Sequence, residues 1–474
     1  MDSRELAFAG AARQAELVRS GEVSPRELVD LCLDRIERLE PRLNAFRIVW
    51  AERARAEADQ AAARARGGED RPLLGVPVAV KDNIDVAGEV TAHGTAAFET
   101  RAREDSEVVR RLRAAGAIIV GKTLLPEFAV WPATQTATYG ATVNPWHAGY
   151  GSGGSSGGSA VAVAAGLVGL AHASDGGGSI RNPAAHCGLF GLKPQRGRVS
   201  LAPDLEHWKG LSVYGCVTRT VADTALFLDA IAGPVASGGG EPSPPAPDRP
   251  FAEAAGAAPG RLRIAVSAKP PIPPAKVDDR QRRALDETAE LLRSLGHDVV
   301  ERDPDFGRVP IQAYFVPRYL RGAREDGERA EHPERLERRT RGLMRLGRLV
   351  PDSALARART DGEAWARGVM RFWDDVDVLV MPTIPGLPGR LNEMEGLGTV
   401  RMVNASTPKV TFTAPWNITG QPAASVPAGW SQEGVPLAVQ LIGRPNDEAT
   451  LLSLAAQLER ERPWADRLPP LAAD

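Results

Sequence analysis

This 474-residue chain contains two stretches rich in glycine and serine, whose residue types and spacing could support catalysis. They read GSGGSSGGS over 151–159 and DGGGSIRNP over 175–183, which places Ser179 24 residues after Ser155 (179 − 155). Three consecutive glycines allow backbone N–H groups to point the same way and to hold an anionic oxygen. Acyl transfer needs such a nest beside its nucleophile, so Ser179 is the candidate nucleophile.

A serine attacks a carbonyl only when a base removes its proton. Histidine is the usual base, but a lysine can serve when burial lowers its pKa. Lys81 follows VPVAV (76–80), an apolar run that predicts a buried strand, and it is the candidate base. The residues alone also allow a surface lysine just past the end of a strand.

Other interpretations of the glycine-rich stretches fit the sequence less well. GYGSGG (149–154) has the spacing of a dinucleotide-binding loop, but no strand precedes it. GGSSG (153–157) has the spacing of a hydrolase nucleophile elbow, but that chemistry needs a late histidine and 333–474 contain none. A flexible linker would not lead directly into a buried apolar helix, which we expect over 160–172.

The elements that must position these residues predict an α/β fold in which helices cover a sheet. Residues 4–66 are expected to be helical, with Ser24 as the N-cap of one helix and Pro25 in its first turn. We expect a helix and a strand within each of 106–123 and 278–301, helices over 160–172, 218–233 and 447–460, and strands over 76–80, 261–267, 375–383, 421–430 and 435–443.

The chain divides into two expected regions. An N-terminal helical segment over 1–66 packs on the core, and an α/β domain covers 67–474. The stretch PVASGGGEPSPPAPDRP (234–250) predicts a flexible loop, and a helical insertion is expected near 305–372. Basic residues of 318–349 alternate with acidic ones, which predicts a solvated helical face.

Composition narrows the class of protein. A formal net charge of −2 with 25% charged residues gives no reason to expect nucleic acid or an anionic membrane as a partner. The longest apolar stretch, 160–173, is shorter than a membrane span, and no signal-peptide run opens the chain. Cys32, Cys187 and Cys216 form no disulfide framework, which fits a reducing compartment. We therefore expect a cytoplasmic protein.

Several motifs together resemble the amidase signature hydrolases. They are GVPVAVKDNIDV (75–86), GGSSGGSA (153–160), GGSIRNPAAHCGLFGLKP (177–194) and GQPAASVPAG (420–429), and they occur in the family's order. The resemblance implies a central mixed β-sheet covered by helices on both faces. It also implies hydrolysis of an amide C–N bond with no metal and no cofactor.

The resemblance implies a triad of two serines and a lysine, in which the bridging serine follows a cis peptide bond. By motif, the nucleophile is Ser179, the bridging serine is Ser155 and the base is Lys81. The neighbours His186 and Cys187 invite a thiol mechanism, but a cysteine at this place is structural in the family.

The resemblance also assigns roles to the loop before the nucleophile. The N–H groups of Gly176, Gly177 and Gly178 are the expected oxyanion donors, and Asp175 and Arg181 are expected to hold the loop. Gly176 departs from the family, in which threonine is common at this place. A glycine there makes the loop easier to move but keeps the N–H group.

The resemblance leaves the substrate more open. The segment with Ala129 and Trp131 corresponds to one that borders the acyl site, and Trp416 lies near another lining segment, although both tryptophans could be ordinary packing residues. The first expectation is an amidase for a small apolar or aryl acyl group. The alternative is a carbamate (urethane) or nylon-oligomer hydrolase of the same family.

Two further possibilities belong to assemblies. The glutaminase subunit of the tRNA-dependent amidotransferase usually carries an acidic residue in the segment that corresponds to 406–427, and none occurs there. A non-enzymatic subunit has no need of the triad, and all three of its residues are present. The expected partner is a small-molecule amide or carbamate, and a homodimer stays open because such dimers are frequent among the relatives.

Overall fold

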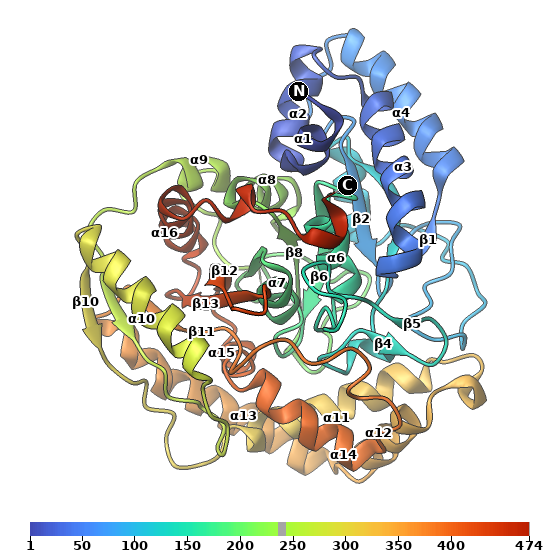
Figure 1. The fold of residues 1–474 in the computed structure, drawn as a ribbon. Coiled ribbons are helices and arrows are strands. Elements are labelled where there is room, and N and C mark those ends of the chain that lie inside the picture. Colours follow the sequence, from blue (N-terminus) through green and yellow to red (C-terminus); the bar gives the residue numbers. More distant parts are fainter. Residues whose placement is uncertain (236–242, 474) are drawn as a thin grey trace.

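The computed structural model describes residues 1–235 and 243–473, and it is built on one large β-sheet of eleven strands (Figure 1). A small sheet pairs β4 (Gln135–Thr136) with β5 (Gly140–Ala141). In spatial order the strands of the large sheet are β1 (Phe46–Val49), β3 (Ile118–Thr123), β2 (Pro77–Lys81), β6 (Leu170–Asp175), β8 (Val213–Thr218), β7 (Phe190–Lys193), β12 (Ala423–Trp430), β13 (Pro436–Ile442), β11 (Val378–Pro382), β9 (Arg263–Val266) and β10 (Asp298–Glu301).

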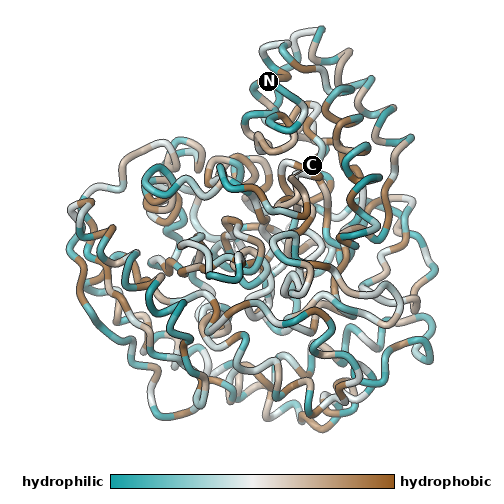
Figure 2. Tube along the Cα trace, in the orientation of Figure 1, coloured by the Kyte–Doolittle hydropathy of each residue, from teal (hydrophilic) through white to brown (hydrophobic). Residues whose placement is uncertain are grey.

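Helices cover both faces of this sheet. One face packs against α5 (Glu107–Ala114), α8 (Val221–Ile231), α9 (Phe251–Gly256), α10 (Asp279–Ser294) and α16 (Glu448–Glu461). The other face packs against α3 (Pro25–Leu43), α4 (Ala51–Arg66), α6 (Gly157–Ala164) and α7 (Arg181–Cys187). Figure 2 shows hydrophobic and hydrophilic residues alternating along the outer helices, as expected for helices with one buried face.

The large sheet is mixed in strand direction. Strand β2 is parallel to β3 and β6, and β9 is parallel to β10 and β11, whereas β6–β8, β7–β12 and β12–β13 are antiparallel. Val78 and Val80 of β2 join the hydrophobic core on one face and Ala79 joins the core on the other. A strand buried on both faces needs a continuous apolar run, which VPVAV supplies. The expected fold class is confirmed.

The N-terminal segment is only partly helical. It contains α1 (Ser3–Phe8), α2 (Gly10–Ser20), α3 and α4, and the expected cap is confirmed because the Glu27 N–H donates to Ser24 Oγ at 3.2 Å. The expectation of helix throughout 4–66 is wrong, because β1 pairs antiparallel with β3 at the edge of the sheet. A four-residue edge strand has too short a pattern to stand out between two long helices.

The helix expected over 160–172 is also wrong. Helix α6 ends at Ala164, and β6 begins at Leu170 between β2 and β8. Gly166 lies between them with φ +63°, a conformation that ends helices and favours glycine. The apolar run therefore serves a short buried helix and then a buried strand, and composition does not distinguish the two.

A layer of helices lies on the opposite side of the molecule from α1–α4 (Figure 1). Helices α11 to α13 fall within the expected insertion near 305–372, and α11 and α12 carry the basic stretch 318–349. Both also bury side chains, among them Tyr314 and Leu343, so the expectation of a solvated face holds for only part of their surface. The layer consists of α11 (Gln312–Glu328), α12 (Arg338–Arg348), α13 (Asp352–Met370), α14 (Thr399–Ser406) and α15 (Pro415–Thr419).

Two expectations on chain organisation stay predictions. The flexible loop expected near 234–250 is only partly described, because residues 236–242 lie outside the described residues. The division into 1–66 and 67–474 is likewise a prediction, although β1 joins the first segment to the main sheet. Within the described ranges, no helix combines the length and the apolar character that crossing a bilayer requires.

Candidate active site

Lys81 ends β2 in the middle of the molecule, and its side chain is fully buried. Its Nζ lies within hydrogen-bond distance of three hydroxyl groups: Ser155 Oγ at 2.7 Å, Ser156 Oγ at 2.9 Å and Ser174 Oγ at 2.9 Å. Lys81 therefore lies among three serines, two from the first glycine-rich stretch and one from β6. The surface position that the sequence allowed for this lysine is wrong.

Burial determines the protonation of Lys81. Desolvation lowers the pKa of the ammonium to about 7, against the opposing effect of the Asp175 carboxylate. A buried lysine with a pKa near 7 is neutral for a large fraction of the time at neutral pH. Lys81 can therefore accept a proton where an ordinary lysine could not.

The hydrogen bonds around Lys81 also suit a neutral amine, which has two N–H groups and one lone pair. Ser156 Oγ donates to the Ser174 carbonyl at 3.2 Å, so it accepts from Lys81. Ser174 Oγ also accepts from Asn83 Nδ2 at 3.2 Å. When Lys81 donates to these two hydroxyls, its lone pair is left for the Ser155 O–H group.

Ser155 and Ser179 differ in their access to solvent. The Gly154–Ser155 peptide bond is cis, and Ser155 is fully buried. Ser179 is the only residue between 152 and 194 that is not buried. The Ser156 N–H donates to the Ser179 carbonyl at 3.3 Å, which brings the two loops together. Among the described residues no hydrogen bond joins the Ser155 and Ser179 side chains, so the direct contact among these three residues is between Lys81 and Ser155.

Asp175 holds the loop that precedes Ser179. Its carboxylate accepts the N–H groups of Gly178 at 2.7 Å and Ile180 at 3.1 Å. It also pairs with Arg181 through Nη2 at 2.9 Å and Nε at 3.0 Å, with both side chains fully buried. Burial alone would raise the pKa of Asp175, but the Arg181 guanidinium and the Asn417 amide hold it below its usual range. The loop is therefore organised around a buried carboxylate.

Arg181 in turn ties the loop to the C-terminal half. Its guanidinium donates to the Thr413 carbonyl at 2.9 Å, to Asn417 Oδ1 at 2.7 Å and to Gln440 Oε1 at 2.7 Å. Asn417 Nδ2 donates back to the carboxylate of Asp175 at 2.9 Å. A buried charge pair is stable only when its remaining hydrogen-bonding groups are satisfied, and this network satisfies them.

The expected set of oxyanion donors needs one correction. Gly178 donates its N–H to Asp175 Oδ1, so that donor is occupied within the loop. Among the described residues, the N–H groups of Gly176 and Gly177 have no acceptor, and neither has the N–H of Ser179. The free donors beside Ser179 are therefore the N–H groups of 176, 177 and 179. The sequence did not reveal that the N–H of Gly178 would donate to Asp175.

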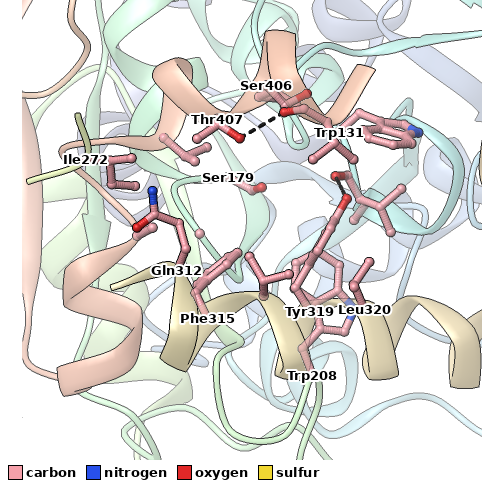
Figure 3. Close-up of a pocket in the computed structure, with 18 of the residues that line it drawn as sticks. Trp131, Ser179, Trp208, Ile272, Gln312, Phe315, Tyr319, Leu320, Ser406 and Thr407 are labelled. Atoms are coloured by element: carbon pink, nitrogen blue, oxygen red, sulfur yellow. Dashed lines mark hydrogen bonds between the residues drawn. The ribbon is translucent and has the colours of Figure 1, made fainter. Parts of the chain in front are cut away.

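A cavity of about 240 Å³ opens onto Ser179 (Figure 3). Ala129 and Trp131 line it, as the resemblance suggested. Trp416 does not, because it is fully buried against Phe306 and Trp373. The lining residues share an uncharged character: Ala129, Val130, Trp131, Pro132, Gly154, Gly177, Ser179, Asn182, Trp208, Ile272, Ile311, Gln312, Phe315, Val316, Tyr319, Leu320, Leu346, Val403, Ser406, Thr407, Val410 and Ala414.

The sequence did not identify the residues of α11 and of the loop before β8 as part of this site. Phe315 and Tyr319 lie four residues apart on one side of α11, around the start of the charged stretch 318–349. Trp208 belongs to a loop with no recognisable motif. The i, i+4 aromatic pair was the only available signal, and it is also common in ordinary cores.

The structure does not favour the alternative chemistries. Burial raises the pKa of the Cys187 thiol, and its Sγ donates weakly to the Ser152 carbonyl at 3.7 Å. Burial also lowers the pKa of His186 to about 3, so the imidazole is neutral. Across the described residues, no group of three or more histidine, cysteine, aspartate or glutamate side chains could hold a metal ion.

Three comparisons with known proteins point to one family. A family model described as Amidase matches residues 27–452. The chain is 48% identical over 472 residues to the putative amidase AmiB2 of Mycobacterium tuberculosis, with 99% of both chains covered. It resembles the structure of a 6-aminohexanoate cyclic dimer hydrolase with a TM-score of 0.92 and 33% identity over 99% of both chains. It resembles a bacterial aryl acylamidase with a TM-score of 0.86 and 25% identity over 98% of both chains.

Proposed function

Because this chain belongs to the amidase signature family of amide-hydrolysing enzymes, we propose that it cleaves amides of small apolar or aryl acyl groups through an acyl-enzyme at Ser179. Lys81 is the base and Ser155 the relay. The observation that supports this assignment is the buried Lys81, which contacts Ser155 at 2.7 Å beside the accessible Ser179.

The proposed reaction moves one proton along the relay. Neutral Lys81 takes the proton of the Ser155 hydroxyl while Ser155 takes that of Ser179, and Ser179 Oγ bonds to the carbonyl carbon. When the C–N bond breaks, the same relay returns the proton to the leaving amine. Water then enters by the same path and releases the carboxylic acid, which restores Ser179.

The negative charge that develops on the carbonyl oxygen needs fixed donors. We assign this role to the free N–H groups of Gly176, Gly177 and Ser179. The ion pair of Asp175 and Arg181 holds these groups in place before the substrate arrives, so no reorganisation is needed during the reaction.

The cavity supports the choice of acyl group. Its lining contains no charged side chain, and its few polar side chains include Asn182 and Gln312. An apolar or aryl amide enters such a cavity without leaving a charge unpaired. Free glutamine carries an ammonium and a carboxylate that would find no partner there, so we do not propose the glutaminase activity.

The second candidate is an amide of aminohexanoate units. The likeness to a cyclic-dimer hydrolase over 99% of both chains favours it. A cyclic diamide has no free amine and no free carboxylate, so it also suits an uncharged cavity. The same relay could open an aryl carbamate, and the test below therefore includes one.

The test is a panel of substrates run with the wild type and with Ser179→Ala. The panel holds a short aliphatic amide, an aryl acylamide, linear and cyclic aminohexanoate amides, an aryl carbamate and glutamine, and the measurement is the amine or ammonia released. We expect the aryl acylamide to turn over fastest and the variant to lose at least about 10⁴-fold in kcat/KM.

A matched control separates loss of the nucleophile from damage to the cavity. Ser406 also lines the cavity, and Ser406→Ala should keep kcat/KM within about tenfold of the wild type. Equal losses in Ser179→Ala and Ser406→Ala would contradict the assignment of the nucleophile. Turnover of an aminohexanoate amide alone would replace the first candidate with the second.

A further inference from the structure

Trp208 is wedged between the oxyanion loop and α11. A Cβ built on Gly176 would lie 2.6 Å from Cε3 of the indole, and one built on Gly322 of α11 would collide with its Cδ1. The indole thus occupies a slot whose two sides are glycines. The threonine that is common in the family at the place of Gly176 would not fit beside this ring.

The indole is also held by its polar atom. Trp208 Nε1 donates to Asp326 Oδ2 at 2.9 Å, and His207 Nε2 lies 3.0 Å from both oxygens of the same carboxylate. Burial would raise the pKa of Asp326, but His207 and the indole N–H lower it, so the carboxylate is ionised. Ser212 Oγ completes the chain at 2.9 Å from His207 Nδ1. A buried network of this kind fixes one orientation of the ring.

The backbone at Trp208 is unusual as well. Trp208 has φ +49° and Lys209 has φ +55°, a region that bulky L-residues rarely adopt. Arg318 of α11 donates to the Lys209 carbonyl at 2.9 and 2.6 Å. Such conformations persist only where the surroundings impose them, and they gather at functional sites.

Trp208 joins two aromatic residues of α11 to form what we call the aromatic wall: Trp208, Phe315 and Tyr319. The rings of Trp208 and Tyr319 meet edge to face with centroids 5.2 Å apart, and those of Phe315 and Tyr319 stack at 5.9 Å. Phe315 packs on Gly177, where an added Cβ would lie 2.9 Å from its Cζ. The aromatic wall therefore backs both glycines that carry free oxyanion donors.

The two sides of Ser179 are bounded differently. The relay returns a proton to the leaving amine, so the amine lies on the side of Ser155 and Gly154. A Cβ on Gly154 would lie 2.6 Å from Ala133 N, so the segment 131–133 bounds the amine side, although the resemblance associates this segment with the acyl site. In the view of Figure 3, Trp131 lies above Ser179, and Phe315 and Trp208 lie below it. The substituent that remains, the acyl group, faces the aromatic wall.

We propose that the aromatic wall binds the acyl group and that Trp208 is its specificity-determining residue, which selects flat aromatic acyl groups over flexible aliphatic ones. This inference rests on the proposed amide hydrolysis at Ser179. A ring stacks or meets another ring edge to face at little entropic cost, whereas a flexible chain must be ordered against a rigid surface. The slot between Gly176 and Gly322 keeps the indole in the orientation that this contact needs.

The experiment compares two substrates that release the same amine. Benzoyl and hexanoyl 4-nitroanilide differ only in the acyl group, so their ratio of kcat/KM reports the acyl side alone. We expect the wild type to favour the benzoyl substrate, and Trp208→Leu to lower the ratio about tenfold or more. Phe315→Leu should also lower the ratio, but by a smaller factor. This variant tests the aromatic wall if Trp208→Leu does not fold.

Two control variants separate specificity from general damage. Trp131→Leu should leave the benzoyl-to-hexanoyl ratio unchanged and should alter the ratio between benzoyl 4-nitroanilide and benzoyl hexylamide. Asp326→Asn keeps an oxygen that accepts the indole N–H, so the benzoyl-to-hexanoyl ratio of kcat/KM should stay close to that of the wild type. Asp326→Leu removes that acceptor and should lower the ratio towards that of Trp208→Leu.

A second readout does not depend on amide turnover. Phenylmethanesulfonyl fluoride and hexanesulfonyl fluoride both modify a reactive serine. The Ser179 Oγ–S bond forms, and the hydroxyl proton and the fluoride leave. Mass spectrometry of the intact protein measures the rate of modification by each reagent. A drop in the aromatic preference of Trp208→Leu supports the aromatic wall even if no amide is hydrolysed, in which case the proposed function alone fails. Two results would overturn the inference. One is a wild type that prefers hexanoyl 4-nitroanilide and hexanesulfonyl fluoride over their aromatic counterparts. The other is an equal loss of rate for the aromatic and the aliphatic compounds in Trp208→Leu.

Discussion

The proposed catalytic centre, which consists of Lys81, Ser155, Ser179 and the loop around Asp175, meets the aromatic wall at Gly176 and Gly177. The two regions are held by different kinds of contact. The centre rests on the sheet, where Lys81 ends β2 and where every residue from 152 to 194 except Ser179 is buried. Its contacts are hydrogen bonds and one buried ion pair. The aromatic wall belongs to a loop and to a helix outside the sheet, and its contacts are mainly between rings.

This difference separates two kinds of consequence. A buried polar network fails when one member is removed, because the remaining groups lose their partners. An apolar surface tolerates a change of shape and responds with a changed fit to the ligand. We therefore expect substitutions in the centre to remove activity or stability, and substitutions in the aromatic wall to change the choice of substrate.

The largest expected effect is the loss of the base. Lys81→Met keeps the length of the side chain but cannot accept a proton, and we expect kcat/KM to fall by about 10⁴-fold or more. Lys122 is the matched control, because it is also a buried lysine but pairs with Asp82 at 3.2 Å, so Lys122→Met should mainly cost stability. Rates measured on folded protein separate a loss of catalysis from a loss of stability. A folded Lys81→Met variant with near-normal turnover would refute the relay.

The next effect concerns the stability of the centre. Asp175→Asn leaves the Arg181 guanidinium buried without its counter-ion, which should cost about 3 to 5 kcal/mol of the free energy of unfolding. Beside the aromatic wall, Lys209 pairs with Glu325, whose side chain is 42% exposed. Glu325→Gln should cost about 1 kcal/mol or less. Urea unfolding of both variants makes the comparison, and equal losses would contradict the contrast between the two regions.

How far the sequence predicts the structure differs in the same way between the two regions. Lys81 could be placed at the end of an expected buried strand because VPVAV is a short apolar run that ends at the lysine, and the resemblance then assigned it as the base. Asp175 and Ser179 could be placed because consecutive glycines beside a serine have few other uses. The aromatic wall could not, because Trp208 and α11 meet only through the tertiary fold, more than 100 residues apart in the chain.

Two errors show why local patterns were insufficient. The run 160–172 is apolar throughout, so its division at Gly166 into a helix and a strand depends on the pairing of β6 with β2 and β8. The third glycine, Gly178, was expected to donate to the substrate, but Asp175 takes its N–H group. Both outcomes depend on partners that a linear pattern does not reveal.

The third prediction uses pH to distinguish the two regions. Burial lowers the pKa of Lys81 to about 7, and in the proposed relay only the neutral amine accepts a proton. We therefore expect kcat/KM to rise about tenfold per pH unit below 7 and to level off above it. Next to the aromatic wall, burial would lower the pKa of His207, but Asp326 outweighs it and raises the pKa. Asp326→Asn should therefore leave the midpoint in place. A midpoint that moves with Asp326, or a rate that falls as the pH rises through 7, would point away from Lys81.

The smallest expected effect lies in the aromatic wall. Tyr319 donates its hydroxyl to the Val130 carbonyl at 2.9 Å and so links α11 to the opposite side of the cavity. Tyr319→Phe keeps the ring and removes this link, which should cost about 1 kcal/mol of stability and leave kcat nearly unchanged. Steady-state kinetics and thermal unfolding check this, and a large loss of kcat would show that the hydroxyl takes part in the chemistry.

The hydrogen bonds of Arg181 have a consequence for the synthesis of the enzyme. Its acceptors Thr413, Asn417 and Gln440 follow it by 232 to 259 residues. A ribosome therefore completes Lys81, Ser155 and Ser179 when less than half of the chain exists, long before it adds the residues that anchor the loop of Ser179. Unfinished chains should be hydrolytically silent, so that a reactive serine is assembled only as translation ends.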